Sequence, residues 1–95
     1  MEISILRTES RIRSLDPVEL LVVVDGRTIR AAIDWSTLER LMGADLVNEE
    51  KVHDFMRKNR DGIELAIKAH LFAHGVPLAG RLVLTLDDIA NLHPL

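Results

Sequence analysis

The 95-residue chain contains no cysteine and no tyrosine. Without cysteine it can form no disulfide, no thiol nucleophile and no cysteine-ligated metal site. Its aromatic residues, Trp35, Phe55 and Phe72, make up 3% of the chain, so a folded core must be largely aliphatic. The lack of cysteine fits a reducing compartment, and we expect a cytoplasmic protein.

The chain also lacks a long apolar run and an excess of basic residues. No apolar stretch approaches the ~18 residues of a membrane span, and Glu2 places an acid where a signal peptide needs a base. The net charge is −3, whereas a non-specific nucleic-acid binder is normally basic because phosphate neutralisation supplies its affinity. The composition therefore favours neither membrane nor nucleic-acid association.

What remains is a composition that suits one folded domain. Hydrophobic residues make up 47% of the chain, which argues against disorder. No linker, repeat or low-complexity segment divides the sequence, so residues 1–95 are interpreted as a single domain. Residues 2–7 alternate in the manner of a short strand, and the first ~16 residues are expected to form a loosely attached edge of the sheet.

An Asp-Gly pair between two β-rich runs is the strongest structural signal. Asp25 and Gly26 both tolerate the positive φ of a two-residue hairpin turn. The pattern predicts a hairpin over residues 18–33 in which Val24 faces Arg27. This register places seven apolar side chains on the core face: Val18, Leu20, Val22, Val24, Ile29, Ala31 and Ile33.

Helical periodicity follows the hairpin. A short helix is predicted over residues 35–42, with Asp34 as its side-chain N-cap. A longer helix begins after Asn48 and ends at Gly75. Gly62 inside it either lowers the stability of the helix or marks a kink. A third good strand (80–85) and a helical turn (87–92) follow. The predicted fold is α+β: an antiparallel sheet of three or four strands against one short and one long helix.

A histidine pair is the sharpest candidate for chemistry. His70 and His74 are four residues apart, so they share a helix face and can chelate a transition metal. Asp87, Asp88 and His93 are the convenient third ligands. The alternative is that the two histidines pack at a helix C-terminus, where their cationic form favours the helix dipole.

Catalytic patterns are weak. The adjacent acids Asp87-Asp88 and Glu49-Glu50 do not face each other on a helix, so capping and solubility account for both pairs. A catalytic triad could be drawn from the residue types of Asp34, Ser36 and His53. The sequence around Ser36 is not that of an activated nucleophile, so we do not expect one. We therefore expect no enzymatic activity and no cofactor.

Seven basic residues could converge to bind nucleic acid: Arg7, Arg11, Arg13, Arg57, Lys58, Arg60 and Lys68. Acids are interleaved among them, and Arg60 is placed to form an ion pair with Glu64 four residues on. A solvated helix face explains this pattern better, so nucleic-acid binding stays a second alternative behind metal or small-ligand binding.

The back of the long helix carries an apolar patch. Leu65, Ala69 and Phe72 lie opposite the core-facing stripe, on a face that is polar in its first half. Such a patch is typical of a partner surface, unless the last strand or the tail covers it. A symmetric homodimer is the commonest way to bury such a patch. Leu21 and Val23 on the open sheet face could extend the contact.

The chain resembles the small bacterial domain of unknown function numbered fourteen-eighty-eight. The resemblance covers residues 17–88 and rests on Val24-Asp-Gly-Arg-Thr-Ile29, Ile33-Asp-Trp-Ser-Thr-Leu38, Arg60-Asp-Gly-Ile63-Glu64 and Gly80-Arg-Leu-Val-Leu-Thr85. It implies a compact α+β fold with no established activity, cofactor or catalytic residue. Ala31 stands where such proteins often carry a cysteine, so a thiol-based role would not transfer.

Overall fold

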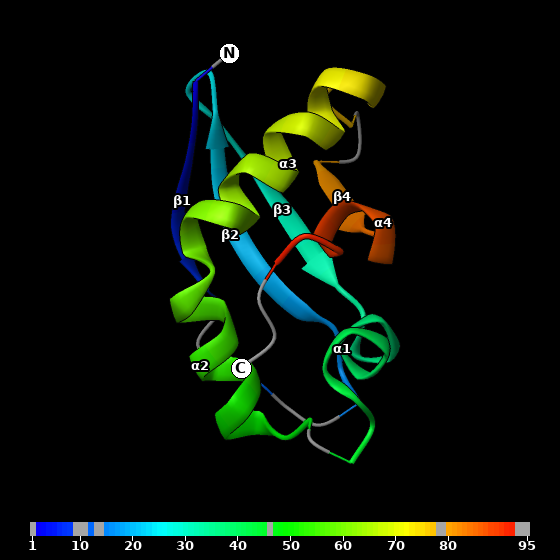
Figure 1. The fold of residues 1–95 in the computed structure, drawn as a ribbon. Helices are drawn as coiled ribbons and strands as arrows, with labels where there is room; N and C mark the ends of the chain where they lie inside the picture. Colours follow the sequence, from blue (N-terminus) through cyan, green and yellow to red (C-terminus); the bar gives the residue numbers. More distant parts are fainter. Residues whose placement is uncertain (1, 9–11, 13–14, 46, 78–79, 93–95) are drawn as a thin grey trace.

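A computed structural model describes residues 2–8, 12, 15–45, 47–77 and 80–92. In these ranges the chain forms a four-stranded sheet and four helices, which makes it an α+β protein as predicted (Figure 1). The elements in chain order are β1 (Ile3–Thr8), β2 (Val18–Val24), β3 (Arg27–Ile33), α1 (Trp35–Met42), α2 (Glu49–Lys58), α3 (Arg60–His74), β4 (Arg81–Leu84) and α4 (Leu86–Ile89).

The β2–β3 hairpin has the register that the sequence predicts. Val24 pairs with Arg27, and Val18 pairs with Ile33 at the far end. Asp25 and Gly26 form the turn with φ of 49° and 81°, the left-handed region that Asp and Gly tolerate best. All seven apolar side chains predicted for the core face are buried, each at most 2% exposed.

Strand β1 is an edge strand and pairs antiparallel with β2 along its length. Its register shifts between Ile5 and Arg7, so β1 has an irregularity of the kind that a bulge produces at sheet edges. The start of β1 is also tied to the hairpin turn: the Glu2 N–H donates to Asp25 Oδ1 (2.9 Å), and the Asp25 N–H donates to the Glu2 carbonyl (3.0 Å).

Strand β4 pairs with β3 in parallel, so the prediction of a wholly antiparallel sheet was wrong at this edge. The connection from β3 to β4 runs through α1, α2 and α3, which return the chain to the end of the sheet where β3 begins. A parallel pair needs a long crossover of this kind, usually helical, and residues 34–80 provide it.

Helix α1 has the predicted bounds, but its predicted side-chain cap was wrong. The Asp34 side chain accepts no capping hydrogen bond. Instead, the backbone carbonyl of Asp34 accepts from the Thr37 and Leu38 N–H groups, at 3.0 and 3.2 Å. Asn48 does cap α2 through its side chain, which accepts from the Lys51 N–H at 2.9 Å.

The predicted long helix is two helices, α2 and α3, which meet at Asn59 rather than at Gly62. Asn59 is 7% exposed, and its side-chain Nδ2 donates to the Phe55 carbonyl at 3.1 Å. Its backbone departs from helical geometry (φ −105°, ψ 19°), and its own carbonyl accepts from the Ile63 N–H at 2.8 Å. One buried residue thus ends α2 and begins α3.

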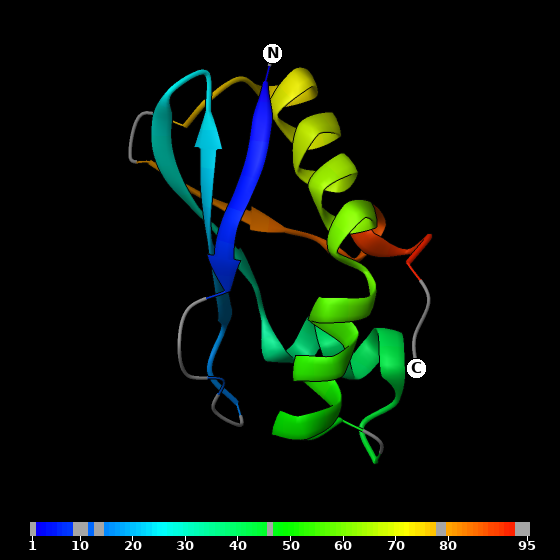
Figure 2. The ribbon, with the colours of Figure 1, turned by 90° about the vertical axis from the view of Figure 1, so that its left-hand side faces the viewer.

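The sheet and the helices form two layers. Figure 2 shows the sheet on one side and α3 lying across it on the other, with α1 and α2 beyond one end of α3. Phe55, Leu38 and Ile67 are fully buried between the layers, and Ile89 of α4 joins the same core. None of the described helices is long and apolar enough to cross a membrane.

Candidate functional site

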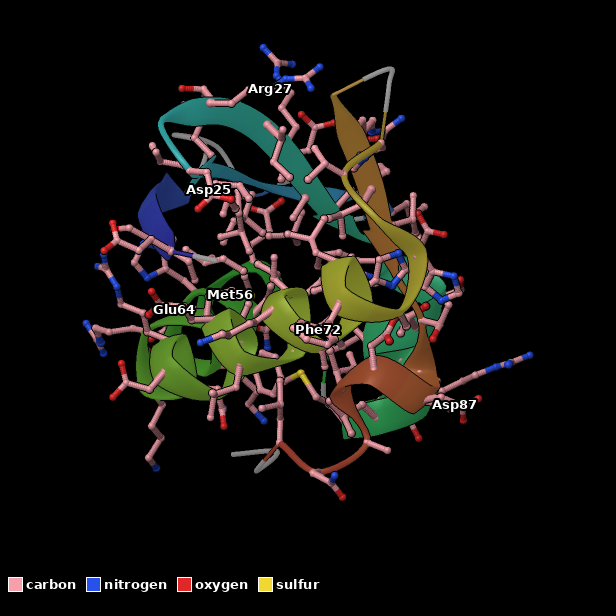
Figure 3. All side chains as sticks on the ribbon, turned by 90° about the horizontal axis from the view of Figure 1, so that it is seen from above. Asp25, Arg27, Met56, Glu64, Phe72 and Asp87 are labelled. Carbon is pink, nitrogen blue, oxygen red and sulfur yellow. The ribbon has the colours of Figure 1, made fainter. Side chains whose placement is uncertain are left out.

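Helix α3 has a buried face and an apolar exposed face. Ile63, Ile67 and Leu71 are each at most 1% exposed, because they point at the sheet. On the opposite side of the helix, Leu65 is 66% exposed and Phe72 is 81% exposed. Figure 3 shows Phe72 on the side of α3 that is turned away from the sheet.

These residues lie one above another. Leu65, Ala69 and Phe72 are spaced by four and three residues, the spacing that places helical side chains on one face. Ala69 is also exposed. Leu65 and Phe72 are exposed, so neither β4 nor α4 covers the patch. We call Leu65, Ala69 and Phe72 the α3 stripe.

Leu21 and Val23 form part of a separate surface. They alternate along β2 with residues that face the helices, so they lie on the open face of the sheet, on the far side from α3 (Figure 2). Both are half-buried. The suggestion that they extend the α3 stripe is therefore wrong in geometry, because the sheet stands between the two surfaces.

The open sheet face is held by ion pairs. Glu19 lies 3.5 Å from Arg30 and 3.4 Å from Arg81, so its carboxylate links β2, β3 and β4. Val83 on β4 is 40% exposed beside this network, and Ala32 at its centre is fully buried. Ala32 is thus shielded from solvent on this face, whereas Val83 stays exposed.

The histidine pair lies where α3 meets α4. His70 Nδ1 is 3.2 Å from Asp88 Oδ2, and both side chains are largely buried, at 18% and 20% exposure. The same Asp88 oxygen accepts from the Thr85 N–H (2.7 Å) and the Thr85 hydroxyl (3.0 Å). Thr85 in turn caps α4, so the two residues form a reciprocal capping box.

His74 stacks beside His70, with ring centroids 4.7 Å apart and planes tilted by 45°. Of the three convenient third ligands, Asp88 is the one that contacts His70. His93 lies outside the described residues. Among the residues that are described, no three His, Asp or Glu side chains are grouped so that they could hold one metal ion.

The charge on Asp88 is stabilised by its neighbours. Burial by itself raises the pKa of Asp88, but hydrogen bonds from the Thr85 backbone, the Thr85 hydroxyl and His70, together with the charge of His70, outweigh it and hold the pKa below its ordinary value. The carboxylate is therefore ionised at neutral pH, and it acts as the acceptor for His70.

Among the basic residues that the structure describes, Arg57 and Arg60 line one hollow, whereas Lys58 and Lys68 do not. Arg57 pairs with Asp54 at 2.8 Å in a solvent-exposed bridge. Arg60 forms no ion pair with Glu64 in the described structure, contrary to the prediction; its guanidinium donates to the Ile5 carbonyl at 2.6 Å and joins α3 to β1. Lys58 is exposed at the end of α2. Lys68 is exposed on α3, about two turns after Arg60. Arg11 and Arg13 lie outside the described residues, and Arg7 belongs to β1.

A hollow of about 200 Å³ lies between β1 and the junction of α2 and α3. No local sequence pattern predicts this hollow, because it brings Ile5 against Met56 and Arg60, more than fifty positions away. Its basic wall already has partners, since Arg57 is bonded to Asp54 and Arg60 to the Ile5 carbonyl. Its lining residues are Ile5, Ile12, Leu20, His53, Met56 (labelled in Figure 3), Arg57, Arg60 and Ile63.

No catalytic triad forms among the residues considered for one. Asp34 precedes α1, Ser36 lies in its first turn, and His53 is exposed on α2. No hydrogen bond joins these three side chains in the part of the chain that is described. Of the adjacent acids, Asp88 belongs to the capping box, while Glu49 and Glu50 occupy the first turn of α2, where they favour the helix dipole.

Comparisons of this chain with protein-family models, with curated proteins and with solved structures found no match.

Proposed function

We propose that this protein is a small non-enzymatic interaction module that forms a homodimer through the α3 stripe. The observation that carries the proposal is the exposure of Leu65 (66%) and Phe72 (81%) on one face of one helix. Single exposed apolar residues are common on protein surfaces. Two large ones stacked on the same helix face, with a small residue between them, are typical of a contact surface.

A second copy of the chain suits this stripe because the stripe is self-complementary. It runs large, small, large along the helix: Leu65, Ala69, Phe72. When two such helices pack antiparallel about a two-fold axis, Leu65 of one copy lies opposite Phe72 of the other. Ala69 then lies close to the axis, where its short side chain lets the helices approach closely.

The rim of the stripe suits a reversible contact. Asp61, Glu64 and Lys68 flank Leu65 and bring both signs of charge, which keep the separate monomer soluble. Burying a Leu or Phe side chain contributes roughly 1.5–3 kcal/mol. Four such side chains per dimer stand against an association cost of about 4 kcal/mol or more. We therefore expect a dimer that dissociates on dilution.

The test is the double variant Leu65→Asp with Phe72→Asp. Both side chains are exposed, so the substitutions should leave the fold intact while placing charges in the contact. Sedimentation equilibrium of the untagged protein should give a dimer for the wild type and a monomer for the double variant. An unchanged mass in a folded double variant would contradict the proposal.

Two matched variants distinguish the α3 stripe from other surfaces. Leu15 is 76% exposed and lies outside the stripe, so Leu15→Asp should leave the dimer unchanged. Val83→Asp places a charge on the open sheet face. Loss of the dimer in Val83→Asp together with its retention in the stripe variant would assign the contact to the sheet instead.

We propose, from the motifs that carry the resemblance, that the chain is a member of the bacterial family numbered fourteen-eighty-eight. The resemblance implies no established activity or cofactor. The absence of cysteine supports the cytoplasm as the place of action.

A further inference from the structure

The last turns of α3 carry a second functional feature, on the opposite side of the helix from the α3 stripe. We propose that His70 and His74 together bind one divalent transition-metal ion, with Asp88 as the residue that orients His70. This site is independent of the dimer contact, because the histidines face α4 whereas Leu65 and Phe72 face away from the sheet.

The first argument is the helical spacing. Imidazoles four residues apart lie one turn above another, and here the ring centroids are 4.7 Å apart. Because His70 is bonded to Asp88, the exposed His74 ring is the one that must rotate about its side-chain bonds to direct a nitrogen at an ion on His70. His74 is exposed at the end of α3, so the pair is open to solvent on that side.

The second argument is the partner of His70. When a neutral His70 donates its Nδ1–H to the Asp88 carboxylate (3.2 Å from Nδ1 to Oδ2), Nε2 is the nitrogen left to bind a metal. Metal-ligating histidines almost always donate their other ring N–H to a carboxylate or carbonyl in this way, which fixes the tautomer and raises the basicity of the ligand. Thr85 holds Asp88 in place through two hydrogen bonds (2.7 and 3.0 Å), so the acceptor is itself fixed.

The third argument is electrostatic. His70 and His74 lie in the last turns of α3, where the helix dipole favours positive charge. Asp88 adds a carboxylate whose Oδ2 lies 3.2 Å from His70 Nδ1. A bound cation would therefore meet a favourable field from both the backbone and the carboxylate.

The ligand set selects the class of metal. Imidazole nitrogen suits Cu²⁺, Ni²⁺ and Zn²⁺, whereas Mg²⁺ and Ca²⁺ prefer oxygen. The described residues offer no group of three ligands, so water fills the remaining positions and the affinity is modest. On the general order for nitrogen ligands, Cu²⁺ should bind more tightly than Ni²⁺ or Zn²⁺.

The experiment is a titration of chelator-treated, untagged protein with each metal alone, followed by calorimetry. We expect one equivalent of Cu²⁺ to bind, Ni²⁺ and Zn²⁺ to bind more weakly, and Mg²⁺ not to bind. His74→Ala is the cleanest variant, since His74 is exposed, and it should abolish the one-equivalent step. His53→Ala, an exposed histidine on another helix, should leave it unchanged.

A second variant tests the role of Asp88. Asp88→Asn keeps the size of the side chain but weakens its acceptance of the His70 N–H, and we expect a 10- to 100-fold loss of metal affinity. ¹⁵N NMR spectra of the imidazole rings should show the Nδ1–H tautomer of His70 in the metal-free wild type. Circular dichroism confirms that each variant is folded.

Two results would overturn the proposal. One is the absence of any heat of binding for Cu²⁺, Ni²⁺ and Zn²⁺. The other is binding that persists undiminished in the His74→Ala and His70→Ala variants, which would assign the metal to other residues. Neither result bears on the oligomeric state, so the failure of this inference is distinguishable from failure of the proposed dimer.

Discussion

Asn59 separates helix α2 from helix α3. Its buried amide donates to the Phe55 carbonyl (3.1 Å) at the point where α2 ends and α3 begins. Sequence reasoning did not find this break, because asparagine is tolerated inside helices and the apolar stripe continues on both sides of it. The signal that could have found it is the preference of Asn for helix ends.

Replacing Asn59 by alanine should destabilise the protein. The change removes a buried hydrogen bond and favours continuation of the helix through the break, and we expect a loss of about 1–2 kcal/mol in the free energy of unfolding. Urea denaturation measures it. The exposed Asn91 is the matched control, and Asn91→Ala should change stability by less than about 0.5 kcal/mol. Equal effects at both positions would contradict the assigned role.

Gly62 lies inside α3 at a close contact rather than at a kink. A Cβ at this position would overlap the side chain of Leu92, which packs on α3 from beyond α4. An ordinary Gly→Ala change inside a helix stabilises by about 1 kcal/mol. Here part of the gain should be offset, because the end of the Leu92 side chain must move away.

The Leu92→Ala background isolates this contact. We expect Gly62→Ala to stabilise the Leu92→Ala protein by about 1 kcal/mol and the wild type by clearly less. Thermal or urea unfolding of the four proteins of the cycle gives the coupling. The same gain in both backgrounds would show that Leu92 does not pack against Gly62 in solution.

At the scale of elements, the sequence predicted the structures that depend on local patterns, and it did not predict the pairings between distant segments. The register of the β2–β3 hairpin follows from a two-residue turn and alternating side chains, both visible within sixteen residues. The parallel pairing of β4 depends on the path of α1, α2 and α3, which no local pattern specifies. For the same reason the sequence predicted an Arg60–Glu64 pair one turn apart, whereas Arg60 reaches Ile5 on β1.

The bond from Arg60 to the Ile5 carbonyl (2.6 Å) attaches the edge strand to the helical layer. Arg60→Met keeps much of the apolar stem and removes the donors, and we expect it to cost about 1 kcal/mol. Hydrogen exchange should then accelerate at the amides of β1 more than at those of β3. Arg57→Met, which breaks an exposed pair, should cost less than about 0.5 kcal/mol. Uniform exchange rates across the sheet in Arg60→Met would contradict this attachment.

At the scale of the whole molecule, the two candidate sites occupy opposite sides of α3. The α3 stripe was identified from helical spacing alone, because a helix face can be read from the sequence. That β4 and α4 leave Leu65 and Phe72 exposed required the fold. His70 and His74 were likewise visible as a pair, but the choice of Asp88 over Asp87 as their neighbour depends on the turn of α4.

The mass of the untagged wild-type protein in solution tests the central claim most directly. Sedimentation equilibrium over a wide concentration range should show a dimer at high concentration that dissociates to monomer on dilution, and the Leu65→Asp, Phe72→Asp protein should be a monomer throughout. A wild-type monomer at every concentration, or a dimer that survives the double substitution in a folded protein, would contradict the account.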